Sequence, residues 1–305
     1  MPRELKNRER GFTMVEIIDG RNIPIKDIAI FVSKLNRQKS HHIGFCGVDR
    51  EEVEKALLED VSEMAAAIEN GKLIGWIGAD TEDDTAEVWG PFVAAGYDIK
   101  IAFDLWENLM NQFPASVNNF ILFSNRENKL VRNFAGKLQF EQKTDQAVLR
   151  FTRSQLKTLP NPQGEELQQP DHSAFIRLHD KAFSGTYYSG REIIGRLNQT
   201  KKVFVLKDQE QLAGYVYVEA EPDFGSGSIE FIAVDPLFQG KGYGKKLLFM
   251  AVHWLFSFDS IKEFKLTVAL DNNNALGLYK AVGFQVEHKL HYFVKQGRSR
   301  IQSGF

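Results

Sequence analysis

The chain has 305 residues, 43% of them hydrophobic, which exceeds the ~100–200 residues of an ordinary domain and predicts two domains. Its 38 Lys and Arg residues against 40 Asp and Glu residues leave a formal net charge of −2, without the basic excess typical of nucleic-acid-binding domains. A single cysteine, Cys46, excludes an internal disulfide framework, and no apolar run reaches the ~20 residues that span a bilayer. We expect a cytoplasmic protein that binds neither nucleic acid nor membrane.

Strands and helices alternate in the first half of the chain. The apolar periodicity predicts strands at 72–79, 87–94 and 119–123 and helices at 99–112 and 128–136. A polar segment follows from Thr152 to Pro170, where three of the nine prolines fall among Gln, Asn and Gly. Such composition favours a loop. We therefore expect a first domain at 1–154, a linker at 155–170 and a second domain at 171–305.

The second half repeats this order of elements. The pattern predicts a hairpin at 202–218, a strand at 228–234, a glycine-rich loop, a helix through 247–255, a strand at 264–270, a helix at 274–282 closed by Gly283, and a last strand at 292–295. Aligning Phe140 with Phe284 places Asn128 on Asn272 without a gap. We therefore expect an internal repeat, in which both halves share one plan.

The loop between the predicted strand and helix of the second half carries spaced glycines. Residues 233–245 read AVDPLFQGKGYGK. Glycines let backbone N–H groups turn toward one point, and the positive end of the following helix faces the same point, so the loop predicts an anion-binding site. It is neither a Walker A loop nor the dinucleotide fingerprint, because G-x-x-x-x-G-K-[ST] is missing and Lys245 stands where a third spaced glycine would be required.

Two motifs give the second half a family resemblance. Residues 239–244, QGKGYG, match [QR]-x-x-G-x-[GA], and residues 272–279, NNNALGLY, followed by Gly283-Phe284, match N-x-x-A-x-x-L-Y with its G-F. In this order and spacing the chain resembles the GCN5-related N-acetyltransferase (GNAT) family, closely over 170–295 and loosely in the first half. The resemblance implies an α/β (α+β) fold of two tandem GNAT-like domains, each a mixed, mostly antiparallel sheet flanked by helices.

The resemblance also implies a co-substrate and the residues that hold it. In similar proteins the loop amides bind the pyrophosphate of acetyl-CoA, while the preceding strand and an asparagine contact its pantetheine arm. Carried over to this sequence, the cofactor-binding residues are Ala233, Val234, Gln239, Gly240, Lys241, Gly242, Tyr243, Gly244, Lys245 and Asn272. Tyr279 matches the family's general acid. A phenol of pKa ~10 can protonate a departing thiolate whose thiol titrates near ~8.5, although a tyrosine packed in a helix face has the same sequence pattern.

The base that deprotonates the acceptor amine is harder to assign. Glu230 lies on the strand that leads into the loop, with the same alternation parity as Ile232 and Val234, so it can accept a proton through water. A solvated strand carboxylate is the alternative. Its rivals as a base follow the preceding strand: Glu219, Glu221 and Asp223.

The histidines and the cysteine indicate no metal site. His179 and His253 lie in predicted helices, and we expect both on helix faces. His41 and His42 have no third ligand in view. Cys46 lies in the other repeat, which weakens a route through a covalent acyl-cysteine.

The first half departs from the family pattern where a cofactor would bind. Residues 90–100, GPFVAAGYDIK, lack the x-x-G-x-G spacing, and Asp98 would face a pyrophosphate with like charge. The alignment puts Ala135 where the second half has Tyr279, while Asn128 is retained. We read this half as a degenerate copy that shapes the acceptor cleft or the packing between domains. The alternative is a second ligand site of unknown kind.

These patterns together predict an enzyme, an N-acetyltransferase that transfers acetyl from acetyl-CoA to a primary amine by direct attack in a ternary complex. Two alternatives stay open. One is a tandem acyltransferase acting on an amino-sugar or thiol precursor, as in mycothiol synthase-like proteins, and the other is a non-catalytic acyl-CoA-binding regulatory module. The acceptor, a small molecule or peptide amine, is expected against residues 183–196 and 219–227, where Tyr187, Tyr188 and Phe224 supply aromatic rings or are ordinary, partly buried aromatics.

Overall fold

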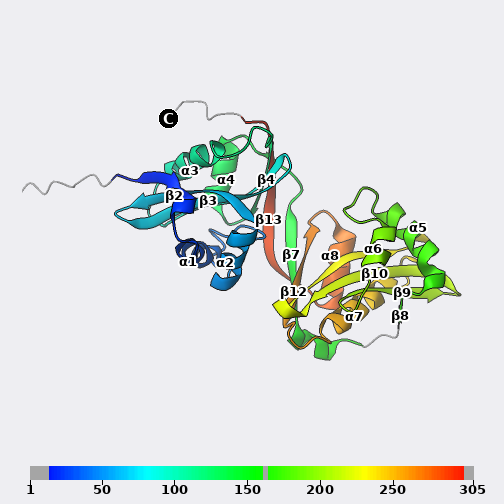
Figure 1. The fold of residues 1–305 in the computed structure, drawn as a ribbon. Coiled ribbons are helices and arrows are strands. Elements are labelled where there is room, and N and C mark those ends of the chain that lie inside the picture. The colour runs from blue at the N-terminus through cyan, green and yellow to red at the C-terminus, as the bar shows by residue number, and fades with distance from the viewer. Residues whose placement is uncertain (1–13, 161–163, 299–305) are drawn as a thin grey trace, which may run out of the picture. The chain divides into compact units, whose positions relative to one another are not determined.

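The chain divides into two compact units in the computed structural model, which describes residues 14–160 and 164–298 (Figure 1). The first unit comprises Met1–Asp145 and Lys289–Phe305, and the second comprises Gln146–His288. No helix in the described part of the chain is long and apolar enough to cross a membrane.

The first unit is built on a mixed sheet in the strand order β1-β2-β3-β4-β5-β13, with the short β6 paired to β13. All of these neighbours run antiparallel except β4 and β5, which are parallel over Thr85–Val88. Its strands are β1 (Glu16–Asp19), β2 (Val61–Glu69), β3 (Lys72–Glu82), β4 (Thr85–Val93), β5 (Asn119–Asn125), β6 (Glu141–Gln142) and the later part of β13 (Gln285–Gln296). Its helices are α1 (Ile25–Asn36), α2 (Arg50–Glu59), α3 (Lys100–Met110) and α4 (Lys129–Lys137).

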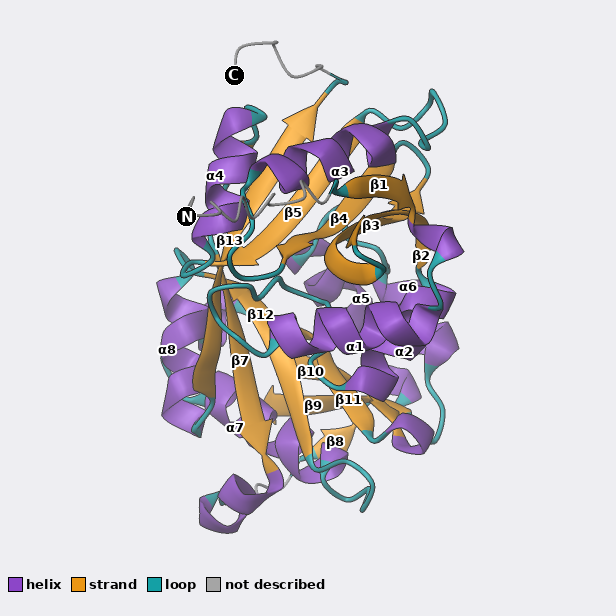
Figure 2. Ribbon diagram, turned by 90° about the vertical axis from the view of Figure 1, so that its left-hand side faces the viewer, coloured by secondary structure: helices purple, strands orange, loops and turns teal. Residues whose placement is uncertain are grey.

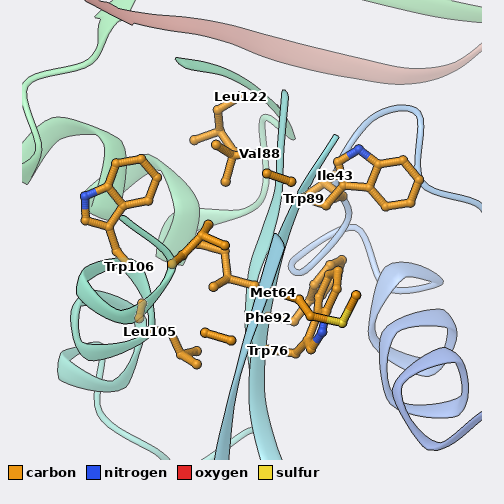
Figure 3. Close-up of a cluster of buried hydrophobic side chains, with 14 of the residues drawn as sticks. Ile43, Met64, Trp76, Val88, Trp89, Phe92, Leu105, Trp106 and Leu122 are labelled. Atoms are coloured by element: carbon orange, nitrogen blue, oxygen red, sulfur yellow. The ribbon is translucent and has the colours of Figure 1, made fainter. Parts of the chain in front are cut away.

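Helices cover both faces of this sheet, which is why β3 is apolar on both sides. Gly75 lies under α3, since an added Cβ would come within 3.1 Å of Leu105. The next residue, Trp76, faces the other side and packs on Phe92 with ring centroids 6.2 Å apart. Figure 3 shows Leu105 and Trp106 on one side of the strands and Trp76 and Phe92 on the other. The helices α1 and α3 lie on these opposite faces (Figure 2).

The second unit contains strands of two sheets. The strands β8 (Glu165–Glu166), β9 (Lys201–Asp208), β10 (Gln211–Glu221) and β11 (Ser226–Val234) form an antiparallel sheet in the order β11-β10-β9-β8. The strand β7 (Gln146–Thr152) pairs antiparallel with β12 (Glu263–Ala269) over its whole length. The helices are α5 (His172–Ala182), α6 (Gly190–Arg196), α7 (Tyr243–Leu255) and α8 (Asn273–Val282).

Alternation along β10 separates two apolar layers in this unit. Tyr215 and Tyr217 join the cluster formed with α5 and α6, and Phe231 of β11 joins them there. Val216 and Val218 face the other way and pack on α7. The sheet β9–β11 is therefore covered on both faces, with α5 and α6 on one and α7 on the other.

Each unit takes one strand from the other half of the sequence. β7 follows the first unit's elements along the chain, yet it pairs with β12, from Thr152 against Glu263 to Gln146 against Ala269. The later part of β13 pairs with β5 in the first unit. Because β5 and β12 hold the same place in the two repeats, the exchanged strands lie at equivalent positions.

The boundaries therefore differ from the expected 1–154, 155–170 and 171–305. The chain enters the second unit after Asp145, ahead of the proline-rich segment, because β7 already pairs with β12. Residues of the expected linker are held by the second unit: Gln155 Nε2 donates to the Gly283 carbonyl at 2.7 Å, and β8 pairs with β9. Residues 161–163 of that segment lie outside the described residues. Its polar composition thus reflects a surface segment of the second unit.

The expected fold class is confirmed. Mixed, mostly antiparallel sheets are flanked by helices, and one order of elements occurs twice, as β2-β3-β4-α3-β5-α4-β7 and as β9-β10-β11-α7-β12-α8-β13. The pair α1 and α2, which precedes this order in the first unit, was not expected from the sequence. The last strand, β13, begins at Gln285, well before the expected 292–295.

Candidate active site

The turn between β11 and α7 leaves open space beside two glycines. Gly240 has a φ of +78° and Gly242 a φ of +82°, and a Cβ built on either would meet no atom within 4 Å. L side chains rarely adopt such φ angles, so the backbone alone favours glycine here. Gln239 holds the turn, because its Nε2 donates to the Val234 carbonyl at 3.2 Å. The turn is therefore a fixed stretch of backbone with room for a ligand.

The helix α7 begins at this turn without a side-chain cap. Gly242 is the N-cap residue and has no side chain to accept from the first N–H groups, which therefore direct their positive partial charge out of the helix. Lys241 and Lys245 are exposed beside them, and Lys241 Nζ lies 2.9 Å from Asp208 Oδ2. Hydrogen bonds from Lys241 and Tyr243 lower the pKa of Asp208. An anion such as a phosphate fits this helix start.

The strands β11 and β12 are in contact but do not pair with each other. β11 is the edge of the four-stranded sheet, and β12 forms its ladder with β7. The backbone groups of an unpaired edge can bind an extended ligand as an additional strand. A short 3-10 helix, Pro236–Phe238, joins the end of β11 to the glycine turn, so one elongated molecule can contact both the strand edge and the turn.

The turn, β11 and α8 meet at Gly244. A Cβ there would lie 3.1 Å from Leu278 Cδ2 and 3.8 Å from Val234 Cγ2, so α7 packs closely on α8 at this point. The next residue of α8, Tyr279, is 9% exposed, and its ring centroid lies 5.4 Å from that of Phe284. Burial raises the pKa of Tyr279 to about 12, so the phenol is protonated at neutral pH.

Asn272 starts α8 as an N-cap. Its Oδ1 accepts from the Ala275 N–H at 3.1 Å, and Asn128 does the same for Val131 at 3.0 Å at the start of α4. A helix-capping role explains why both halves have this asparagine. Asn272 is exposed whereas Asn128 is buried, so the Asn272 side chain remains within reach of a ligand.

Glu230 lies at a β-bulge that its sequence pattern does not reveal. β11 pairs Phe231 with Tyr217 but Ile229 with Val218, which leaves Glu230 as the extra residue between the two pairs. A bulge of this kind bends the strand and re-aims the side chain that it carries.

The bulge makes the expected parity of Glu230 with Ile232 and Val234 wrong. Ile232 and Val234 pack toward α7, together with residues of β10 that share that face. Glu230 Oε2 instead accepts a hydrogen bond from Tyr187 Oη at 2.6 Å, and the Tyr187 ring packs on Phe231, which belongs to the α5–α6 layer. One inserted residue shifts the phase of the alternation, so counting by two along the strand fails at this point.

Glu219, the first rival as a base, is held by cations. Lys201 Nζ lies 2.6 Å from it and Arg196 Nη2 2.9 Å, and the Tyr217 hydroxyl also donates to it. Burial acts to raise the pKa of Glu219, but these three hydrogen bonds outweigh it and lower the pKa. A carboxylate held in this way is a poor proton acceptor. The other two rivals are exposed: Glu221 and Asp223.

His179 is buried, contrary to the expectation of an ordinary helix-face residue. It is 0% exposed, with Nε2 2.8 Å from the Tyr188 carbonyl and Nδ1 2.5 Å from Tyr215 Oη. Because a carbonyl can only accept, Nε2 donates to the Tyr188 carbonyl, and Nδ1 bonds to the Tyr215 phenol. His179 lies four residues after the buried Phe175, on the same face of α5, and this face is turned to the core. His253 is only partly buried, with Nε2 3.0 Å from the Pro160 carbonyl.

His42 and Cys46 are buried in the first unit. Within 14–160 and 164–298, no three His, Cys, Asp or Glu residues gather as a metal site. His42 is buried, with Nδ1 2.8 Å from the Asn36 carbonyl. Cys46 is 4% exposed, and burial raises the pKa of its thiol, which disfavours the nucleophilic thiolate.

The corresponding helix start in the first unit carries a negative charge. Asp98 Oδ1 accepts from the Lys100 N–H at 2.7 Å, so a carboxylate lies at the first N–H group of α3. Trp89 of β4, 4% exposed, pairs with Gly78 of β3 and so takes the place of Phe231, which pairs with Tyr217 of β10. Ala135, fully buried, occupies the place of Tyr279.

The first unit does contain an acidic cavity of about 360 Å³ among its described residues, at the start of β4. Its lining is Asp80, Glu82, Asp83, Asp84, Thr85, Glu87 and Ile121. Burial, together with the nearby Asp80, raises the pKa of Glu87 to about 7. A cavity of this charge repels a pyrophosphate.

Comparison with known proteins gives matches that are strongest in the second half. Residues 163–284 match the acetyltransferase (GNAT) family. The mycothiol acetyltransferase of Kocuria rhizophila is 26% identical over 133 residues, which are 39% of this chain and 44% of that protein. The spermidine N(1)-acetyltransferase of Vibrio cholerae is 33% identical over 104 residues, 33% of this chain and 60% of that protein. The matches thus span less than two thirds of each relative.

A solved structure extends the likeness to both units. A tandem GNAT protein from the clavulanic acid biosynthesis pathway superimposes with a TM-score of 0.59, covering 94% of this chain and 100% of that one. At 12% identity this similarity shows the fold alone.

Proposed function

We propose that the second unit transfers an acetyl group from acetyl-CoA to a primary amine, because residues 163–284 match the acetyltransferase (GNAT) family. One observation carries the proposal: the open turn at Gly240 and Gly242 lies at the uncapped start of α7 and continues the unpaired edge of β11. A phosphate needs the first feature and an extended amide chain needs the second. Acetyl-CoA carries both groups in one molecule.

The proposed contacts follow acetyl-CoA along its length. The N–H groups of residues 240–245 bind the pyrophosphate, and Lys241 and Lys245 offset its charge. The backbone of Ala233 and Val234, at the end of the β11 edge, bonds the pantetheine amides. Asn272 Nδ2 reaches the same arm while its Oδ1 continues to cap α8.

The proposed reaction moves two protons. The acceptor ammonium first loses one proton to Glu230 through water. The amine nitrogen then attacks the thioester carbon, the C–S bond breaks, and the second proton leaves the nitrogen and ends on the departing sulfur. The products are the acetylated amine and the CoA thiol, and direct attack in a ternary complex fits the inert state of Cys46.

Tyr279 supplies a hydrogen bond to the sulfur in this proposal. Burial raises its pKa to about 12, above the ~8.5 of an ordinary thiol. Complete transfer of the phenol proton to the thiolate is therefore uphill. A donor that keeps its proton still stabilises the charge that develops on sulfur.

We further propose that the first unit is a degenerate copy without a cofactor. The Asp98 carboxylate already accepts from the first N–H group of α3, and Ala135 stands in the place of Tyr279. Each change removes one function of the second unit. Retention of the first unit then depends on the strand exchange through β7 and β13.

The proposal is tested by amine-dependent release of the CoA thiol. The full chain is incubated with acetyl-CoA and a panel of polyamines, amino sugars carrying a thiol, aminoglycosides and peptide N-termini, and products are identified by mass spectrometry. We expect one acceptor class to accelerate thiol release and to gain an acetyl group on nitrogen. Acetylation on sulfur would favour the thiol-precursor alternative. Tight acetyl-CoA binding without transfer to any acceptor would favour a non-catalytic binding module.

A further inference from the structure

Tyr187 is the hydrogen-bond partner of Glu230. The 2.6 Å bond ends on Oε2, so the phenol fixes the carboxylate at one oxygen. Burial and the Glu230 carboxylate raise the pKa of Tyr187, which keeps the phenol protonated and makes it the donor. Its ring lies 5.0 Å from Phe231 and 4.8 Å from Tyr188, although Tyr187 is 62% exposed. The phenol thus connects the segment 183–196, where the acceptor is expected, with the bulge of β11.

The chain around Tyr187 is anchored from the core. His179 Nε2 donates to the carbonyl of the next residue, Tyr188, and the Tyr215 hydroxyl fixes the other ring nitrogen. The Arg196 guanidinium lies 4.0 Å from the centroid of the Tyr188 ring on the outside. The buried His179 and the Arg196 guanidinium therefore both hold the segment at Tyr188 in place, and with it the neighbouring Tyr187.

The charged groups around this site come from three further elements and are engaged with one another. Arg196 of α6 and Lys201 of β9 both bind Glu219 of β10. Tyr217 of β10 donates to the same carboxylate. Glu230, by contrast, has an uncharged donor as its partner. Its orientation is therefore set by Tyr187 and not by an ion pair.

We propose that Tyr187 is a positioning residue for proton removal from the acceptor amine. Its hydroxyl holds Glu230 Oε2, so that Oε1 is presented to the water that carries the proton from the acceptor ammonium. In that step an N–H bond of the acceptor breaks and an O–H bond forms on Glu230, while Tyr187 keeps its own proton. This inference rests on the proposed function and on Glu230 as its base.

A double-mutant cycle on the full chain tests it. Tyr187→Phe keeps the ring and its packing but removes one hydrogen bond to a charged group. We therefore expect kcat to fall roughly tenfold, with KM for acetyl-CoA unchanged. In the Glu230→Gln background the same change should lower kcat by less than about twofold, because the group that it positions is no longer a base. Tyr97→Phe is the matched control, since the Tyr97 hydroxyl donates to Glu69 at 2.7 Å in the first unit. It should leave kcat unchanged.

The outcomes separate this inference from the proposed function. An equal loss of kcat from Tyr187→Phe in both backgrounds would mean that Tyr187 acts on the acceptor directly, which would refute the positioning role. Wild-type activity of Tyr187→Phe together with an impaired Glu230→Gln would also refute the positioning role, but not Glu230 as the base. Wild-type activity of Glu230→Gln would refute the base itself.

A second readout needs no turnover. The 13Cζ resonance of Tyr187, assigned by its loss in Tyr187→Phe, should shift in Glu230→Gln, because the carboxylate acceptor becomes an amide. An unmoved resonance would overturn the hydrogen bond on which the inference depends.

Discussion

Replacing Gly242 by alanine separates two demands on this residue, its backbone angle and the open space beside it. An alanine side chain at a left-handed φ such as the +82° of Gly242 lowers the free energy of unfolding by roughly 1–2 kcal/mol. Alanine also reduces the conformational entropy of the unfolded chain, which restores about 0.4–1 kcal/mol of the free energy of unfolding. No atom lies within 4 Å of the added methyl, so no steric term is expected. The protein should therefore lose about 1 kcal/mol of unfolding free energy and stay folded.

The effect on acetyl-CoA should be larger than the effect on the fold. The methyl group would occupy the space from which a phosphate reaches the N–H groups of Gly242 and Tyr243 at the start of α7. Hydrogen bonds to a charged group are worth about 1.5–3 kcal/mol each, so losing two weakens binding by at least about 3 kcal/mol, roughly 100-fold in Kd.

Gly71→Ala supplies the matched control for strain. Gly71 lies in the turn between β2 and β3 with a φ of +73° and equally open space. Denaturant unfolding should give similar losses of stability for both variants, and calorimetric titration of acetyl-CoA should show weak binding only for Gly242→Ala. Equal Kd values for the two variants would refute the assignment of the turn as the phosphate site.

Three further variants test neighbouring parts of the site or serve as a control. Tyr279→Phe should lower kcat roughly tenfold, as loss of a hydrogen-bond donor does, whereas a fall of 10²–10⁴ would mean that the phenol is a full general acid. Burial raises the pKa of Tyr279 to about 12, so its stabilising contribution to the unfolding free energy is present below about pH 10 and is lost as pH rises toward 12. Between about pH 9 and 11 the wild type should lose on the order of 1 kcal/mol more unfolding free energy than Tyr279→Phe, and an equal loss would contradict the burial effect. Asn272→Ala and Asn128→Ala should each lower the free energy of unfolding by about 1 kcal/mol or more, because each loses a helix cap. Only Asn272→Ala should weaken acetyl-CoA binding. Equal acetyl-CoA affinity in the two variants would remove Asn272 from the site.

Local signals predicted the parts of the fold that local physics determines. The glycine turn, the start of α7 and the end of α8 at Gly283, which has a φ of +117°, depend on glycine angles and apolar spacing within a few residues. The order of strands and helices depends on periodicity alone. These features were therefore readable without knowledge of any long-range contact.

The features that were missed depend on partners distant in the sequence. The bulge at Glu230 is defined only by the register against β10. His179 is buried because Tyr188 and Tyr215 satisfy both ring nitrogens, which the α5 sequence does not show. The strands β7 and β13 alternate in a way that suits more than one neighbour, so their exchange could not be predicted, and the unit boundary was placed at the polar segment that follows β7.

The central claim is that one acetyl-CoA site exists, and that it lies at the turn before α7. The most direct test is equilibrium binding of labelled acetyl-CoA to the full chain, with Gly242→Ala beside the wild type. The account predicts one molecule bound per chain, with affinity lost in the variant. Two equivalent molecules per chain would contradict the degenerate first unit, and no binding, or binding that survives Gly242→Ala, would contradict the claim itself.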